Sequence, residues 1–462
     1  MVAPRKLFHI VTLLSMACAA MTATASPVLM ISIDGLKPEY ITHADDHGLR
    51  IPTLRRFLKE GTYADGVIAV FPTVTYPDHT TLITGVWPAE HGILNNQVFD
   101  PEHKLGGAWY WYADSIRVPT LWDVAHRAGM RTASVSWPVS VDANSVDDLI
   151  PEYWRTSSPG DGGNDQDRYL MNAISRPNGA LAQMEARLGP YMMGNDTSVE
   201  KGDEIRTRFA LDILANKKPG FMTIHLSAMD GSEHEGGVFS AKANQTLEAV
   251  DGMVARLMAA AIKNDPRTKI VIVSDHGFLN ITHVVNLYIP FVQAGLVSPG
   301  KGERDAASWK AELWTSGGLT AVMLHDSNDA ATRDQVHDIL TKLASDLENG
   351  IDQVLDAEQA RAHGGFTGAA YVVVMKQGYS MGGATSGPLV QLQSDVKGSH
   401  IGSHGFLPQF PEMHSSFFVL GQGVAQGRDL GTVDMRQIAP TVAEILGVKL
   451  PDAKQAKLQV EQ

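Results

Sequence analysis

The chain has 462 residues, of which 44% are hydrophobic and 19% are charged, so it can bury one large core or two smaller ones and is not a disordered protein. Its formal net charge is −13, and it has no long basic run. This charge argues against a groove for long nucleic acids, but it is compatible with a small phosphate ester held by metal ions.

The first 25 residues have the pattern of a secretory signal. Two basic residues precede an apolar run over 7–20 and a small-residue stretch, so we expect cleavage near Ala25 and an exported protein, either periplasmic or secreted. No later stretch approaches the roughly 20 apolar residues of a membrane span. The one cysteine of the sequence, Cys18, lies in this segment in a poor context for a lipid anchor. Any metal in the mature chain must therefore bind to histidines and carboxylates.

After this segment, short β-branched runs alternate with helical patterns. We expect strands over 28–33, 132–135, 221–226 and 269–274, and helices over 52–59, 120–128 and 244–263. This alternation predicts a mainly parallel α/β sheet with helices on both faces. We expect residues 26–288 and 397–462 to form this core.

The pattern changes over residues 289–396, which we expect to form a small inserted α+β cap. This segment has strand patterns at 319–324 and 370–375 and a helix pattern at 331–347. The glycine-rich stretch 378–387 predicts a mobile loop, as does 157–167. A strand over 415–420 and a closing helix over 435–446 then return the chain to the core.

Polar side chains follow several of these strands, where open α/β sheets collect their ligands. Each short motif has another interpretation when taken alone, as a helix cap, a surface pair or a turn. Together they supply three carboxylates and three histidines, which zinc accepts when no thiolate is present. The four motifs are Ile33-Asp34-Gly35, Asp230-Gly-Ser-Glu-His234, Ser274-Asp275-His276-Gly277 and Gly402-Ser403-His404-Gly405.

A fifth stretch, 71–96, contains a candidate nucleophile. Pro77 suits the first turn of a helix, which places Thr75 or Tyr76 at the helix cap. Free N–H groups at a helix start also favour an anionic group. Thr75 is therefore either a simple cap or a hydroxyl placed beside a phosphoryl group.

The order of these motifs resembles that of the nucleotide pyrophosphatase/phosphodiesterase family in the alkaline phosphatase superfamily. The resemblance runs from about Val28 to Val448 and excludes much of the cap. The stretch 136–140, Ser-Trp-Pro-Val-Ser, is similar to the family's Trp-Pro-Gly-Ser segment, with Val139 in place of glycine. An alkaline-phosphatase-like fold is what this resemblance implies.

The resemblance also implies two zinc ions and a mechanism. One ion would bind to Asp230, His234 and His404; the other would bind to Asp34, Asp275, His276 and the oxygen of Thr75. Thr75 would attack phosphorus and form a phosphothreonine, while Asn96 and the Thr75 N–H hold a phosphoryl oxygen. Zinc lowers the pKa of a bound hydroxyl, so no histidine base is required. We expect His79 and His91 to be structural, and His400 to lie outside the pattern.

The expected substrate is a phosphodiester or pyrophosphate. The sequence near Thr75 has no cation to match a doubly charged monoester, and Lys37 is the nearest one in a matching stretch. His225 stands where nucleotide-specific relatives often have tyrosine, which weakens the nucleotide assignment. His225, Trp137 and Lys37 are candidate substrate contacts. The aromatic run 109–112 is either a substrate wall or sheet-edge packing.

Two other functions remain open. The first is a phosphonate hydrolase, similar to those acting on phosphonoacetate, or a phosphomonoester hydrolase of the same superfamily. The second is a non-catalytic binding protein, which the intact ligand set disfavours. The physiological substrate and the oligomeric state are left open, and the sequons at Asn195, Asn244 and Asn280 matter only in a cell that glycosylates exported proteins.

Overall fold

A computed structural model of the chain describes residues 25–102, 104–154, 164–191, 199–299 and 306–462. The predicted signal over 1–25 lies outside these residues except for its last position. In the described part of the chain, no helix is long and apolar enough to cross a membrane.

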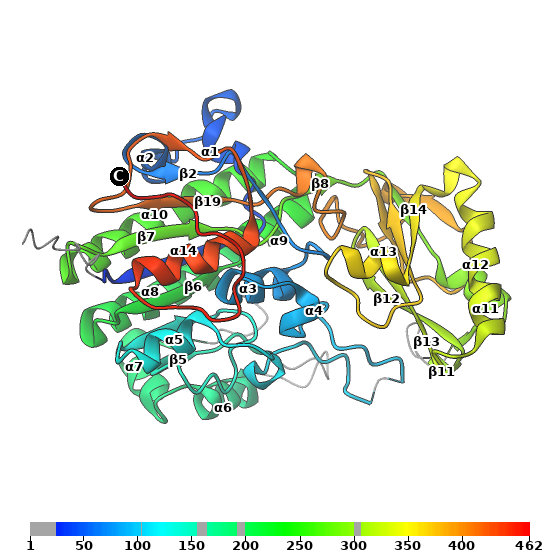
Figure 1. Ribbon diagram of the computed structural model, residues 1–462, viewed down its shortest axis with the longest axis horizontal. Coiled ribbons are helices and arrows are strands. Elements are labelled where there is room, and N and C mark those ends of the chain that lie inside the picture. The colour runs from blue at the N-terminus through cyan, green and yellow to red at the C-terminus, as the bar shows by residue number, and fades with distance from the viewer. Residues whose placement is uncertain (1–24, 103, 155–163, 192–198, 300–305) are drawn as a thin grey trace, which may run out of the picture.

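An eight-stranded, mainly parallel sheet forms the centre of the protein, as predicted (Figure 1). Its strand order is β20-β2-β19-β7-β1-β6-β4-β5. β1 pairs in parallel with β6 and β7, and β4 pairs in parallel with β5 and β6, whereas β19 is antiparallel to β7 and β2. These strands are β1 (Val28–Ile33), β2 (Thr62–Tyr63), β4 (Thr132–Val135), β5 (Asp148–Ile150), β6 (Phe221–Leu226), β7 (Lys269–Val273), β19 (Phe417–Leu420) and β20 (Arg428–Asp429).

Helices cover both faces of this sheet, because the central strands are apolar on both sides. Every residue of β1 is buried, and its side chains alternate between two hydrophobic clusters. Leu29, Ile31 and Ile33 pack with one set of helices, and Val28 and Met30 pack with the other. The first set is α1 (Glu39–Thr42), α2 (Pro52–Glu60), α8 (Val199–Lys217) and α10 (Ala241–Asn264); the second is α3 (Thr75–Thr84), α5 (Leu121–Arg127) and α14 (Ile438–Ile445).

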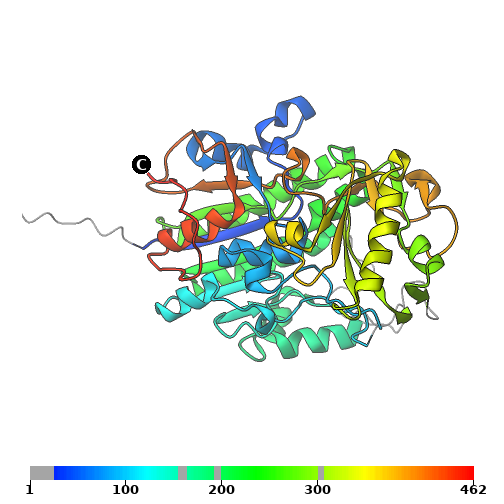
Figure 2. The ribbon, with the colours of Figure 1, turned by 45° about the vertical axis from the view of Figure 1, so that its right-hand side comes forward.

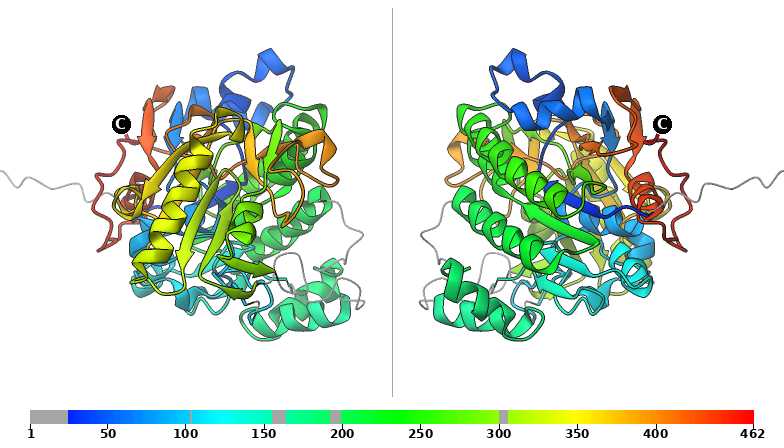
Figure 3. Two further views of the ribbon diagram at one scale, coloured as in Figure 1. Left: turned by 90° about the vertical axis from the view of Figure 1, so that its right-hand side faces the viewer. Right: turned by 90° about the vertical axis from the view of Figure 1, so that its left-hand side faces the viewer.

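A four-stranded antiparallel sheet with two helices lies within residues 289–396, on one side of the core (Figures 1 and 2). Its order is β12-β13-β15-β14. We call it the cap. It comprises β12 (Ala311–Ser316), β13 (Leu319–Leu324), β14 (Ile351–Asp356), β15 (Tyr371–Met375), α12 (Ala330–Ala344) and α13 (Ala357–Ala362). Figure 3 shows the cap facing the viewer in one view, and the opposite side of the core, with its long green helices, in the other.

The cap is joined to the core by side chains on both sides of the boundary. Val372 and Val374 of β15 share a hydrophobic cluster with Phe71 and Leu94 of the core. A three-stranded sheet, β16-β9-β17, also joins β9 (His283–Val285), which precedes residue 289, to β16 (Tyr379–Met381) and β17 (Val390–Leu392). The boundaries of the cap at 289 and 396 stay a prediction.

Both loop predictions need correction. The stretch 378–387 contains β16, whose backbone pairs with β9 in parallel register, and only residue 378 and residues 382–387 are free of helix and strand as predicted. The other loop was predicted to run to residue 167. Its first part lies outside the described residues, and α6 (Asn164–Ile174) begins inside it.

The remaining elements are short and connect these layers. They are β3 (Gly66–Ile68), β8 (Leu279–Asn280), β10 (Val297–Pro299), β11 (Ala306–Trp309), β18 (Gly402–Ser403), β21 (Thr432–Asp434), α4 (Pro88–His91), α7 (Ala180–Leu188), α9 (Ala228–Gly236) and α11 (Tyr288–Gln293).

Candidate active site

Three aspartates lie together because three neighbouring parallel strands end at the same edge of the sheet. Asp34 follows β1, Asp275 follows β7, and Asp230 lies in the first turn of α9 after β6. The Asp34 N–H donates to the carbonyl of Leu226, 2.9 Å away, and so extends the pairing of β1 with β6. The Gly35 N–H donates to Oδ1 of Asp275 at 3.1 Å. The predicted carboxylates are therefore neighbours in the structure.

The three predicted histidines point toward these carboxylates. His234 is one helical turn after Asp230 on α9, which places both on one face, with Nε2 3.3 Å from Oδ1 of Asp230. His404 follows β18; its Nδ1 faces the carbonyl of Thr73 at 3.1 Å, and its Nε2 lies 3.5 Å from the same Asp230 oxygen. His276 stacks on His404 with ring centroids 3.6 Å apart.

Two groups in the described residues could each hold a metal ion: Asp34, Asp275 and His276, and Asp230, His276 and His404. The first contains the protein side chains predicted for one zinc, apart from Thr75. The second contains two of the three predicted for the other, together with His276, and His234 contacts it through Asp230.

Four atoms that face into these groups are buried and have no hydrogen-bond partner in the described part of the chain. They are Oδ1 of Asp34, Oδ1 of Asp230, Oδ2 of Asp275 and Nε2 of His276. Nε2 of His276 lies 3.3 Å from Oδ2 of Asp275 and 3.5 Å from Oδ1 of Asp34. With zinc–ligand bonds of about 2.0–2.1 Å, the edge of a tetrahedral site is about 3.3 Å long. The donor types and spacing therefore fit zinc.

The electrostatics of the groups also favour cations. Burial raises the pKa of Asp34 well above its usual range, and the nearby Asp275 and Asp230 raise it further. Burial lowers the pKa of His276 to about 4, so its ring is neutral near pH 7. With Nδ1–H donating to the carbonyl of Gly277 at 3.2 Å, the lone pair on Nε2 is available as a ligand. A divalent cation would relieve the repulsion between the crowded carboxylates, and the neutral imidazoles have lone pairs with which to bind it.

Thr75 is the first residue of α3 and is nearly buried, at 9% exposure. The N-cap residue of α3 is Val74, one residue earlier than predicted, and no side chain forms an N-cap hydrogen bond with this helix. The Thr75 hydroxyl is therefore not used as a cap. Its own carbonyl accepts from Nδ1 of His79 at 2.8 Å, and that nitrogen lies 3.5 Å from Oδ2 of Asp275. Helix α3 thus begins beside the first metal group.

Asn96 lies against the start of the same helix. Its Oδ1 accepts from the Tyr76 N–H at 2.8 Å, which leaves its amide nitrogen as a donor. The Thr75 N–H has no acceptor among the described residues. Asn96 thus lies where the prediction needs a donor for a phosphoryl oxygen.

A cavity of about 590 Å³ lies between the core and the cap and is lined by Val74, which precedes Thr75, and by Asn96. Its described lining includes amides, hydroxyls and glycines, and no aspartate or glutamate, although the chain is acidic. Lys397 is the cation among these lining residues, and it has no ion-pair partner in the described part of the chain. Its lining residues include Asn95, Asn96, Trp109, Lys397, His400 and His404.

His400 also belongs to this site, although its sequence pattern did not place it there. Its Nδ1 is 2.6 Å from Nδ1 of His234, and the two ring centroids are 4.1 Å apart. The signal in the sequence was its position four residues before His404 in a short segment. That spacing alone does not show that the segment folds back onto α9.

The sequence model of the family described as type I phosphodiesterase / nucleotide pyrophosphatase matches residues 28–407, which is most of the chain. The chain belongs to this family. Ectonucleotide pyrophosphatase/phosphodiesterase family member 1 of Homo sapiens is 26% identical over 264 residues, covering 54% of this chain and 23% of that protein. Venom phosphodiesterase 2 of Crotalus adamanteus is 25% identical over 266 residues, covering 56% of this chain and 27% of that protein. The match therefore spans about a quarter of the length of these relatives.

Solved structures of the family share the fold. Murine ectonucleotide pyrophosphatase/phosphodiesterase 5, as an inactive variant in complex with AMP, has a TM-score of 0.64 at 17% identity, with 93% of this chain and 97% of that chain covered. The human protein of the same name has a TM-score of 0.63 at 17% identity, covering 92% and 95%. The similarity confirms the predicted alkaline-phosphatase-like architecture.

The three predicted substrate contacts do not line the cavity. Trp137 is fully buried in the hydrophobic cluster that contains Val28 and Met30 of β1, and His225 is 1% exposed. Neither side chain is therefore accessible to a substrate. His225 instead contacts Asp34 from the core side. Lys37 is 7% exposed, and its charge acts on the buried carboxyl of Glu233, whose pKa burial raises. The sequence predicted a substrate contact at His225, so its buried position was not expected.

The aromatic run 109–112 was predicted to form either a wall of the substrate site or packing at a sheet edge, and its residues differ in their surroundings. Trp109 lines the cavity and also packs edge-on against Tyr76. Trp111 is buried and packs against Tyr153, whereas Tyr112 is exposed. His79 and His91 are fully buried and hydrogen-bonded, as expected of structural histidines, and burial lowers the pKa of each to about 3.

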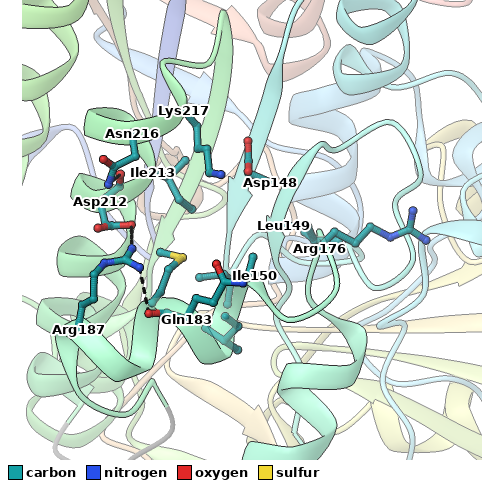
Figure 4. A pocket seen from close by; sticks show the side chains of 13 residues that line it. Asp148, Leu149, Ile150, Arg176, Gln183, Arg187, Asp212, Ile213, Asn216 and Lys217 are labelled. Atoms are coloured by element: carbon teal, nitrogen blue, oxygen red, sulfur yellow. Dashed lines mark hydrogen bonds and ion pairs between the residues drawn. The ribbon is translucent and has the colours of Figure 1, made fainter.

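A second cavity of about 270 Å³ lies between α7, α8 and β5 and contains none of the predicted site residues (Figure 4). Its charges are largely paired. Arg187 forms an ion pair with Asp212 at 2.8 Å, and Asp148 pairs with Arg131 at 2.6 Å. The pairing of these charges, and the absence of the predicted site residues from its lining, make it the weaker candidate for the site.

Proposed function

We propose that this chain is a two-zinc hydrolase that cleaves phosphodiester or pyrophosphate bonds, with Thr75 as nucleophile. The observation that carries the proposal is a set of four buried carboxylate and imidazole atoms at the ends of β1, β6 and β7 that have no hydrogen-bond partner among the described residues. Buried polar atoms are almost always hydrogen-bonded, so such a cluster fits the ligands of a bound cation. When bound, the zinc ions would supply Lewis acidity, which lowers the pKa of a hydroxyl or water and stabilises charge on phosphorus.

The side chains then have distinct roles. Asp34, Asp275 and His276 would hold one ion together with the Thr75 oxygen, and Asp230, His234 and His404 would hold the other. Thr75 Oγ1 forms a bond to phosphorus while the bond to the leaving oxygen breaks, which gives a phosphothreonine that water hydrolyses. The Asn96 amide and the Thr75 N–H donate to a phosphoryl oxygen, because each has a free donor at the start of α3.

A singly charged phosphoryl group suits this site better than a monoester. The described lining of the adjoining cavity offers Lys397 as its cation and has no arginine. A diester carries one charge on the reacting phosphate and brings a second arm, which the cavity of about 590 Å³ has room to hold. Amides and hydroxyls in the lining suit a polar arm of the nucleotide type, and the AMP complex of the murine relative supports this substrate class.

We also propose that the chain is exported, because its first 25 residues have the order of a secretory signal.

The test of the function is a comparison of two chromogenic esters with the zinc-loaded, purified chain. We expect a higher kcat/KM for bis-p-nitrophenyl phosphate than for p-nitrophenyl phosphate. A clear preference for the monoester would reverse the assignment, and turnover of phosphonoacetate alone would favour a phosphonate hydrolase. A panel of dinucleotides, nucleoside triphosphates, nucleotide sugars and phosphocholine esters then identifies the second substituent on the phosphate.

A further inference from the structure

A continuous chain of buried hydrogen bonds runs from Asp34 to the helix that carries Thr75. Nε2 of His225 lies 2.9 Å from Oδ2 of Asp34, and Nδ1 lies 2.8 Å from Oε2 of Glu152. The other carboxylate oxygen of Glu152 accepts from the Tyr76 hydroxyl at 2.9 Å. Side chains from β1, β6, α3 and the segment after β5 thus form one connected unit.

Strand register explains how His225 reaches Asp34. Ser32 of β1 is the register partner of His225 on β6. Side chains two residues apart on a strand share a face, so Ser32, Asp34 and His225 all point to the same side of the sheet. The pairing register of β1 and β6 therefore places the ring of His225 beside the carboxylate of Asp34.

The contacts fix the orientation of His225 and, through it, that of Asp34. Both ring nitrogens face oxygen acceptors, since Nδ1 also lies 3.2 Å from the carbonyl of Ser136. The ring cannot turn without losing hydrogen bonds in a fully buried place. Because Oδ2 of Asp34 is occupied by His225, the unpartnered Oδ1 is the oxygen that faces His276 and the first metal group.

The other end of the unit reaches the phosphoryl-binding side. Tyr76 is held at its hydroxyl by Glu152 and at its N–H by Oδ1 of Asn96. The latter contact turns the amide nitrogen of Asn96 outward as a donor. A change at His225 or Glu152 therefore reaches both a metal ligand and the residue that follows Thr75.

We propose that His225 and Glu152 are positioning residues that orient Asp34 toward the metal ion and, through Tyr76, set the start of α3 and the amide of Asn96. The inference rests on the proposed function for the identity of the ion. Hydrogen-bond partners of metal ligands commonly contribute 10- to 100-fold to metal affinity or activity. This role explains why a buried histidine stands at a position where a substrate contact was expected.

The first test compares His225→Gln with wild type by zinc competition against a chelator and by steady-state kinetics. Glutamine has one amide group and cannot reach both carboxylates, so we expect about 10- to 100-fold weaker binding of one of the two zinc ions. At saturating zinc we expect kcat to fall while KM changes little. Wild-type zinc affinity together with wild-type kcat in this variant would overturn the proposal.

The matched control is Thr223→Val. Thr223 is two residues earlier on the same strand and face, is fully buried, and bonds to Trp122 and Ser134 rather than to a site residue. Its replacement should lower stability but leave zinc affinity and kcat within about twofold of wild type. An equal loss of zinc affinity in this control would assign the His225 effect to general damage of the core and would contradict the proposal.

Glu152→Gln and Tyr76→Phe keep side-chain size and test the unit if His225→Gln does not fold. The effects of Glu152→Gln and Tyr76→Phe on kcat should be non-additive, because each change disrupts the same hydrogen bond between Tyr76 and Glu152. Losses that simply multiply in the double variant would contradict it. The zinc measurement needs no substrate: a chain whose zinc affinity depends on His225 but which cleaves no diester would refute the proposed function and retain this inference.

Discussion

The pKa values of two buried histidines in this protein are shifted in opposite directions, and the groups that contact each ring decide the direction. Burial lowers the pKa of His91, whose ring contacts the hydroxyl of Thr81 and the N–H of Ile93. Burial acts in the same direction on His225, but the carboxylates of Glu152 and Asp34 outweigh it and raise the pKa well above its usual range. Two fully buried histidines of this protein thus have pKa values shifted in opposite directions.

The neutral ring of His91 predicts a specific pH dependence. Its folded pKa of about 3 is below the unfolded value of 6.5, so the unfolded chain binds the proton first as the pH falls. Its contribution to stability is complete above pH 6.5 and is lost toward pH 3, by about 1.4 kcal/mol per pH unit. The destabilisation caused by His91→Gln should therefore be about 2 kcal/mol smaller at pH 5 than at pH 8.

Urea unfolding of wild type and His91→Gln at both pH values measures this difference and cancels the titration of all other groups. A difference that is the same at pH 5 and pH 8 would show that His91 is not held neutral by the fold.

The sequence was enough to predict that the carboxylates and histidines of the candidate site lie together, but not to predict the side chains that contact them from behind. Asp34 and Asp275 each follow an apolar run, and strand ends meet at one edge, so their proximity follows from chain order. Glu152 also follows a short strand, but its partner His225 is 73 residues away along the chain. Such a contact depends on which strands are neighbours in the sheet, which motif spacing does not contain.

Among the elements, the turn after β4 departs most from ordinary backbone preferences. Val139 has φ of +57°, a left-handed conformation that a β-branched residue rarely adopts. The resembling segment of the family has glycine at this position. Val139 is nevertheless fully buried in a cluster with Tyr76, Ile93 and Trp111, so its packing opposes its backbone strain.

This strain predicts a reversed order of two variants. Glycine usually destabilises a folded chain by roughly 0.5–1 kcal/mol relative to alanine. A left-handed backbone costs an L-residue about 1–2 kcal/mol, and only glycine avoids that cost. We therefore expect both variants to be less stable than wild type through lost packing, with Val139→Gly more stable than Val139→Ala by roughly 0.5–1 kcal/mol.

The measurement is the free energy of unfolding of the two variants in urea. If Val139→Ala were the more stable of the two, the backbone at this turn would carry no strain that glycine relieves.

Element types were predictable where hydrophobic patterns are strong. The expected strands over 28–33, 132–135 and 221–226 agree with β1, β4 and β6 residue by residue. Helix ends were less accurate, and the closing helix begins with a 3-10 turn, Met435–Gln437, before α14. The short strand β16 was missed because its pairing with β9 comes from backbone contacts across the molecule rather than from local side-chain pattern.

At the scale of the whole molecule, the site is assembled from segments more than 300 residues apart. Asp34 and His404 approach each other because the chain returns to the core after the cap, and the N–H of Gly405 donates to the carbonyl of Thr73 at 3.0 Å. The cavity forms only between the cap and the core. Its size and acid-free lining could not be predicted from sequence, since they depend on how the two parts pack.

In the proposed mechanism, a metal-activated threonine performs the first chemical step. Its most direct test is zinc analysis together with turnover of bis-p-nitrophenyl phosphate for wild type, Thr75→Ala and Thr75→Ser. We predict two zinc ions per chain in wild type and in Thr75→Ala, loss of nearly all turnover in Thr75→Ala, and partial turnover in Thr75→Ser, which keeps the hydroxyl. Unaltered turnover in Thr75→Ala, or one zinc ion or none in wild type, would contradict the claim.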